Sequence, residues 1–135
     1  MDREALKSLL PHREPMLLLD EAELCGNEAT ASYTVRGDEF FLRGHFPGQA
    51  VVPGVILCEM MGQSCCVLLE DSNGLPYLTG LNRVKFKNKV APGDKIVLKS
   101  RLIKTKAPFY FVQAEAYVGE KLCACGEISF AMIKT

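Results

Sequence analysis

The sequence is poor in residues that hold metals and in features that direct a chain to a membrane. It has 135 residues, no tryptophan and only two histidines. Its six cysteines (25, 58, 65, 66, 123 and 125) include no C-x-x-C pair, so we expect no zinc site and free thiols in a reducing cytoplasm. The first residues are charged and lack an apolar signal segment. The longest apolar stretch, 51–69, is interrupted by Glu59 and Gln63, so we expect no membrane insertion.

The formal net charge is zero, but the two halves of the chain differ. Residues 1–71 hold 5 basic and 12 acidic residues, a net charge of −7, and residues 72–135 hold 11 basic and 4 acidic residues, a net charge of +7. This asymmetry predicts one basic face and an acidic partner. Because the pI is near 6.7 and tryptophan is absent, we do not expect nucleic-acid binding.

Length and composition indicate one soluble globular domain, residues 1–135, with 48% hydrophobic and 24% charged residues. Periodicity and turn signals predict a short helix at 2–10, a strand from Met16 towards Leu24, a turn at Gly26-Asn27 and a strand at 30–35. An ordered loop at 37–52 is expected to lead into a helix that Pro53-Gly54 opens and that runs to about Glu70. After a break at 71–74, strands are predicted near 77–90, 95–105, 108–119 and 121–134. The long helix is apolar nearly all round, which predicts burial on most sides. The expected fold class is α+β, with a curved antiparallel sheet around one central helix.

The densest cluster of candidate chemistry surrounds His45 and Glu59. His45 lies in a loop fixed by glycines and prolines, and an imidazole is the usual protein base near neutral pH. A histidine that only caps a turn is the alternative. Glu59 is the only acidic or basic residue between His45 and Glu70, and a carboxylic acid kept protonated in an apolar site can donate a proton to a leaving group. An exposed rim position or a subunit-contact salt bridge is the alternative for Glu59.

Gln63 and Gly54 extend this cluster. Gln63 follows Glu59 by four residues and can orient it from the same helix face, unless it makes only a simple polar contact. Gly54 has no Cβ, so a ligand carbonyl can approach the outward-pointing amide at the start of the helix. A base, an acid and an oxyanion donor are what β-elimination beside a thioester carbonyl requires. The sequence separation of His45 and Glu59 does not fix their geometry.

Several short motifs occur in an order typical of one enzyme family. They are Leu10-Pro11-His12-Arg13, Phe40-Phe41, Gly44-His45-Phe46-Pro47, Val52-Pro53-Gly54-Val55, Glu59-Met60-Met61-Gly62-Gln63, Gly80-Leu81, Val84-Lys85-Phe86 and Val90-Ala91-Pro92-Gly93-Asp94. From about Leu10 to the C-terminus, the chain resembles the FabZ-type (3R)-hydroxyacyl-[acyl-carrier-protein] dehydratases of fatty acid biosynthesis.

The resemblance implies a hot-dog fold and dimers, often assembled as trimers of dimers, in which His45 of one subunit faces Glu59 of the other. His45 would remove the C2 proton of a 3-hydroxyacyl thioester, and Glu59 would protonate the departing hydroxyl, giving a trans-2-enoyl thioester. No metal or organic cofactor is implied. The Gly54 amide would polarise the thioester carbonyl. The residues expected to bind substrate are Gly54, Val55, Phe46 and Gln63.

Some positions depart from the pattern of the family. Ala50 stands where proline is common, Glu14 where an aromatic is common, and Met60 and Gly62 where alanines are common. These changes leave the acyl-chain length open. His12 is expected to be structural, and the cysteines at 65, 66, 123 and 125 are expected to be small core residues.

Four basic residues recur at every second position: Arg83, Lys85, Lys87 and Lys89. This period predicts four positive charges on one strand face. A solvated face is the plain explanation, and docking of an acidic acyl carrier protein, steered by electrostatics, is the functional one.

Two other functions stay open at this stage. A hot-dog thioesterase would use the same tunnel but hydrolyse the thioester, and a non-catalytic subunit would only bind acyl thioesters. If the protein is a dehydratase, its acyl group could also be carried by coenzyme A, or the enzyme could belong to a polyketide pathway.

Overall fold

The computed structural model describes residues 1–69 and 74–134. Its helices are α1 (Arg3–Leu9) and α2 (Gly54–Cys66), with the 3-10 turns η1 (Phe40–Leu42) and η2 (Val67–Leu69). Its strands are β1 (Glu21–Cys25), β2 (Glu28–Thr34), β3 (Leu75–Phe86), β4 (Lys95–Lys106), β5 (Phe109–Val118) and β6 (Lys121–Ile133). The six strands pair antiparallel in one sheet of order β1-β2-β4-β5-β6-β3.

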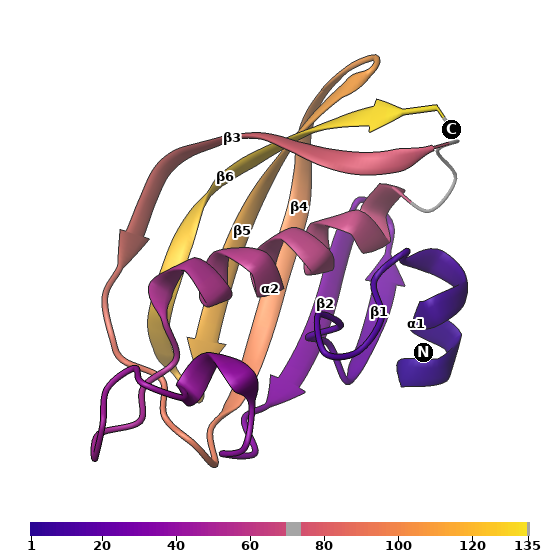
Figure 1. The fold of residues 1–135 in the computed structure, drawn as a ribbon. Helices are drawn as coiled ribbons and strands as arrows, with labels where there is room; N and C mark the ends of the chain where they lie inside the picture. Colours follow the sequence, from indigo (N-terminus) through magenta and orange to yellow (C-terminus); the bar gives the residue numbers. More distant parts are fainter. Residues whose placement is uncertain (70–73, 135) are drawn as a thin grey trace.

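The sheet curves around α2, which crosses its concave side (Figure 1). Met60 and Met61 of α2 are fully buried and belong to the same core as Leu98 of β4 and Ile128 of β6. Burial of each such side chain stabilises the fold by about 1.5–3 kcal/mol. The predicted α+β class, with an antiparallel sheet around one central helix, is confirmed.

The short N-terminal helix is present as α1, close to the predicted range. The Asp2 side chain accepts a hydrogen bond from the Ala5 backbone N–H at 2.9 Å, which caps the first turn. Leu6 is fully buried and anchors the helix to the core. The predicted turn at Gly26-Asn27 joins β1 to β2, with Gly26 in the left-handed region at φ 63°.

The segment before β1 is not a strand, so the prediction of a strand from Met16 is wrong there. β1 begins only at Glu21, and the three consecutive leucines before it are all buried, without the alternation of a strand. The Arg3 guanidinium donates to the carbonyl oxygens of Leu17 at 2.7 Å and Leu19 at 2.9 Å. Side chains therefore satisfy backbone groups that a neighbouring strand would otherwise pair.

The long helix is shorter than predicted. Pro53 is its cap, with extended backbone, and not its first helical residue, and α2 passes into η2 after Cys66. Glu70 and the predicted break at residues 71–73 lie outside the described residues. The expected burial on most sides is confirmed, since Val55, at 75%, is the one exposed residue of α2. Within residues 1–69 and 74–134, no helix is long and apolar enough to cross a membrane.

Candidate active site

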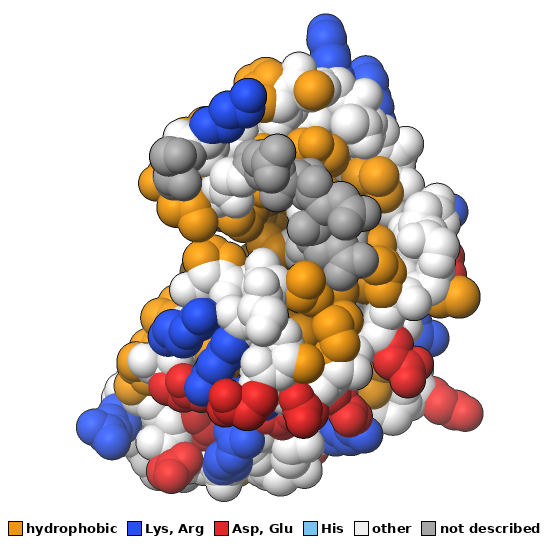
Figure 2. Space-filling view, turned by 90° about the vertical axis from the view of Figure 1, so that its right-hand side faces the viewer, with side chains coloured by type: hydrophobic (Ala, Val, Ile, Leu, Met, Phe, Trp, Pro, Cys, Tyr) orange, Lys and Arg blue, Asp and Glu red, His pale blue; other side chains and the backbone are white. Residues whose placement is uncertain are grey.

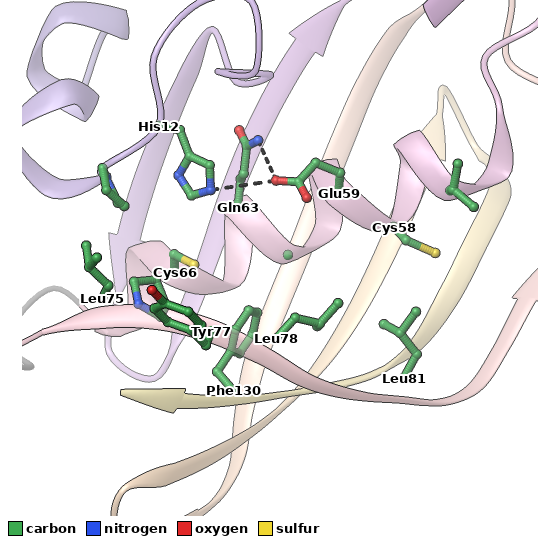
Figure 3. Close-up of a pocket in the computed structure, with 14 residues that line it drawn as sticks. His12, Cys58, Glu59, Gln63, Cys66, Leu75, Tyr77, Leu78, Leu81 and Phe130 are labelled. Carbon is green, nitrogen blue, oxygen red and sulfur yellow. Dashed lines mark hydrogen bonds and ion pairs between the residues drawn. The ribbon is translucent and has the colours of Figure 1, made fainter. Parts of the chain in front are cut away.

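A cavity of about 550 Å³ lies between α2, β3 and the segment after α1. Figure 3 shows polar side chains of α2 and the N-terminal segment on one side of it and apolar side chains of β3 on the other. Its lining residues are Pro11, His12, Val55, Cys58, Glu59, Gly62, Gln63, Cys66, Leu75, Pro76, Tyr77, Leu78, Leu81 and Phe130. Figure 2 shows the hollow from the side, with hydrophobic side chains gathered around it. The shape and lining suit an acyl chain with a few polar groups at one wall.

Glu59 is held in this wall by Gln63. The Gln63 Nε2 donates to the Glu59 Oε2 at 2.8 Å and to the Met16 carbonyl oxygen at 2.6 Å, while its Oε1 accepts from the Leu18 N–H at 2.8 Å. Gln63 is only 1% exposed. Backbone groups bind both the nitrogen and the oxygen of the Gln63 amide, so Gln63 can orient Glu59, as the sequence suggested. These three hydrogen bonds leave the amide little capacity to bind a substrate.

His12 also lies at this wall, and the sequence analysis missed its position. Its Nε2 lies 3.6 Å from the Glu59 Oε2, as the dashed line in Figure 3 marks. Burial lowers the pKa of His12, an effect that Glu59 opposes. Within the described part of the chain, its buried Nδ1 has no hydrogen-bond partner. The only sequence signal was the short Leu10-Pro11-His12-Arg13 motif, which does not say where the ring points.

His45 lies outside this cavity, in the loop before α2. Its half-buried ring stacks on Phe46, with centroids 4.2 Å apart, and its Nδ1 lies 3.2 Å from the Val51 carbonyl oxygen. His45 is not among the residues that line the cavity with Glu59. A single chain therefore does not bring the predicted base and acid into one cavity.

Gly54 borders a second, smaller hollow of about 280 Å³, together with Phe86, Lys87 and Lys89. A Cβ added to Gly54 would lie 3.1 Å from the Phe86 ring, so glycine permits this close approach. Val55 lines the larger cavity, and Phe46 is 55% exposed. Of the predicted substrate-binding residues, Gly54 and Val55 thus lie at the start of α2, Phe46 lies in the loop before it, and Gln63 lies in the last turn of α2.

The four basic residues are all exposed, but they do not form one strand face. β3 ends at Phe86, so Lys87 and Lys89 lie beyond it, and the pairing with β6 shifts between Asn82 and Lys85. The bulge breaks the two-residue period, because an extra residue rotates the side chains that follow. The prediction of a single charged strand face is wrong.

The thiols at the cavity are protonated near neutral pH. Burial raises the pKa of Cys58, and burial together with Glu59 raises the pKa of Cys66 to about 12. All six cysteines are free, which agrees with the prediction, and Cys58 and Cys66 serve as small lining groups of the cavity.

β3 is an edge strand with an exposed apolar surface. Its side chains Tyr77, Leu78, Leu81 and Phe86 are 47–57% exposed, although Leu78 and Leu81 also line the cavity. Such an apolar patch on an unpaired edge is typical of a subunit interface. Part of this exposed apolar surface therefore borders the cavity.

Comparison with known proteins decides the family. Residues 21–127 match the family of ApeI-like dehydratases. The chain is 39% identical to the 3-hydroxyacyl-[acyl-carrier-protein] dehydratase FabZ of Streptococcus thermophilus, over 98% of this chain and 97% of that protein. It is 40% identical to the enzyme of the same name from Moorella thermoacetica, over 98% of this chain and 96% of that protein. The chain belongs to the FabZ-type dehydratase family.

Solved structures give the same fold for the dehydratase. The dehydratase heterocomplex ApeI:P from Xenorhabdus doucetiae contains a chain that superposes with a TM-score of 0.84 and 20% identity, over 96% of this chain and 91% of that one. The uncharacterised protein PH1136 from Pyrococcus horikoshii superposes with a TM-score of 0.72 and 17% identity. The hot-dog fold and the family resemblance read from the sequence are both confirmed.

Proposed function

We propose that the protein removes water from 3-hydroxyacyl groups on acyl carrier protein, in cytoplasmic fatty acid biosynthesis, giving trans-2-enoyl thioesters. The observation that carries the proposal is Glu59, the one carboxylate among the described residues that line an otherwise largely apolar cavity. Gln63 holds one of its oxygens, so the other is available to a substrate hydroxyl. A fixed carboxylic acid in an apolar site is suited to proton donation.

The elimination needs a base opposite this acid. In the proposed reaction, the His45 imidazole takes the C2 proton, the C2 electron pair forms the C2–C3 double bond, and the C3–O bond breaks. The Glu59 carboxylic acid gives its proton to the departing hydroxyl, which leaves as water. The Gly54 amide, at the start of α2, stabilises the negative charge that develops on the thioester oxygen. Metal and organic cofactors have no role in this scheme.

The proposed active unit is a homodimer, with the partner subunit's His45 facing Glu59. Two observations support it: His45 does not line the cavity of its own chain, and the exposed apolar side chains of β3 border that cavity. An isologous pair would create two identical sites, since each chain gives one histidine and one glutamate. Three such dimers are expected to form the larger assembly.

A direct product assay tests the activity. The purified protein is incubated with a 3-hydroxyacyl carrier-protein thioester and, in parallel, with its coenzyme A analogue. Enoyl thioester without release of free thiol is the expected result. Free thiol without enoyl product would indicate a thioesterase, and acyl binding without any product from about pH 6 to 9 would indicate a binding subunit.

The exposed basic residues beyond the bulge of β3 are proposed to dock the acidic carrier protein. Lys85→Glu combined with Lys87→Glu should raise KM for carrier-protein substrates by about tenfold or more and leave KM for coenzyme A analogues within about twofold. The matched control is Lys104→Glu combined with Lys106→Glu, at the β4–β5 hairpin. Equal effects of the two pairs on carrier-protein substrates, or equal effects on both carriers, would remove the docking claim.

Gly62 is proposed to leave room for the acyl chain. A Cβ at this position would lie 3.8 Å from the Phe130 ring, which is ordinary contact, so alanine fits and a longer side chain fills the cavity. Gly62→Met should therefore lower kcat/KM for long acyl chains by about tenfold relative to four-carbon substrates, as expected for loss of apolar contact area. Gly62→Ala is the control and should retain the wild-type preference. An unchanged preference in Gly62→Met would place the acyl chain elsewhere.

A further inference from the structure

His12 stands out because its ring faces the proposed acid although the proposed reaction does not use it. Its Nε2 lies 3.6 Å from the Glu59 Oε2, and the Gln63 Nε2 lies 2.8 Å from the same oxygen. Two nitrogen groups thus converge on Oε2 from α2 and from the N-terminal segment (Figure 3). Both of these contacts are made with Oε2 of Glu59 and neither with Oε1.

Hydrogen bonds hold the backbone turn that carries the ring. The Arg13 guanidinium donates to the carbonyl oxygens of Leu10 at 2.9 Å, His12 at 2.7 Å and Lys7 at 3.0 Å, which fixes the turn that carries the histidine. The His12 Nδ1 is buried and, among the described residues, has no hydrogen-bond partner. An unsatisfied buried nitrogen costs free energy, so a ring that served only packing would be better replaced by an apolar one.

We propose that His12 is a positioning residue that, together with Gln63, holds Oε2 of Glu59 and thereby makes Oε1 the oxygen that carries the catalytic proton. In the tautomer that fits, Nε2 bears the hydrogen and Nδ1 is bare. The present separation of 3.6 Å exceeds a hydrogen bond of about 2.7–3.2 Å, and hydrogen bonds of this kind tighten when substrate binds.

The surroundings of His12 keep it neutral. The titratable or charged groups near it are Glu59, Cys58 and Cys66 of α2, Tyr77 of β3 and the adjacent Arg13. Burial lowers the pKa of His12 and Arg13 lowers it further, while Glu59 acts in the opposite direction. At neutral pH the ring is therefore an uncharged donor. It orients the Glu59 side chain without placing a full positive charge beside it.

The test uses two amides that differ by one methylene. A glutamine amide reaches the position of the imidazole Nε2, and an asparagine amide reaches that of Nδ1. His12→Gln should keep kcat within about threefold of wild type, whereas His12→Asn should lower kcat about tenfold or more with KM nearly unchanged.

The outcomes separate positioning from packing. A histidine that served packing alone would not distinguish the two amides, and both variants would then have the same kcat. Equal kcat in the two variants, or a better asparagine variant, would overturn the proposal. If the asparagine variant does not fold, His12→Ala replaces it, and added imidazole should restore its kcat; no rescue would also overturn the proposal.

Because this proposal rests on the proposed role of Glu59, Glu59→Gln is assayed beside the His12 variants. Wild-type turnover in Glu59→Gln would show that the proposed acid is wrong. Loss of turnover in Glu59→Gln, with His12→Gln and His12→Asn behaving alike, would overturn only the role of His12.

Discussion

Glu59→Gln is expected to lower kcat for dehydration by about a thousandfold, within the range for removal of a general acid. Glutamine keeps the shape of the side chain, and its amide oxygen can still accept the hydrogen bond that Gln63 donates to Glu59. It cannot give a proton to the departing hydroxyl. KM should therefore stay within about threefold of wild type, because the loss lies in the transition state. Steady-state and single-turnover rates of enoyl thioester formation measure the effect.

The matched control is Glu23→Gln, at an exposed position of β1 on the other edge of the sheet. It makes the same chemical change away from the cavity and should leave kcat unaltered. Thermal melting and size-exclusion chromatography of both variants show whether fold and assembly are kept. A kcat for Glu59→Gln within a few-fold of the control would mean that another group supplies the proton.

His45→Ala is expected to lower kcat by about a thousandfold as well, because no other group replaces the base at C2. Its ring is held by the Val51 carbonyl and by stacking on Phe46, so its removal leaves an opening where a small base can enter. Added imidazole should therefore restore part of the activity. Rates are measured with and without imidazole, over a pH series.

Glu59→Gln is the control for the rescue of His45→Ala by imidazole, because imidazole should not restore activity to Glu59→Gln. A His45→Ala variant with wild-type kcat/KM would contradict the proposed base. Loss of activity together with loss of the dimer would show a structural role for the loop instead.

The fold was largely predictable because its long elements carry strong local signals. Strands β4, β5 and β6 are bounded by turns rich in glycine, proline or charged residues, and α2 is a continuous apolar run after Pro53-Gly54. The apolar run at residues 17–19 misled the prediction, because three consecutive buried leucines look like a strand. Their backbone is bound by Arg3, a long-range contact that periodicity does not reveal.

The candidate site was predictable only in part. Glu59 stood out as the one charge in an apolar helix, and its spacing from Gln63 predicted the contact that the structure shows. His12 lies 47 positions before Glu59, so no local pattern could bring it to the same cavity. Only the fold of the N-terminal segment against α2 does so.

The basic residues at the end of β3 and just beyond it were wrongly predicted to share one strand face. Their period of two was real in the sequence, but a bulge before Lys85 and the end of β3 at Phe86 interrupt the strand that would have aligned them. A bulge depends on how two strands pair, so one strand's sequence does not predict it.

The central claim is that each active site combines His45 of one subunit with Glu59 of another, and subunit mixing tests it most directly. His45→Ala and Glu59→Gln chains are purified, mixed under conditions that allow subunit exchange, and assayed for enoyl thioester formation. Random exchange gives half mixed dimers, each with one intact site of two, so about a quarter of wild-type activity should return from two nearly inactive proteins. If the mixed dimers form, as differently tagged subunits would show, and activity stays at the level of the separate variants, the shared site is contradicted.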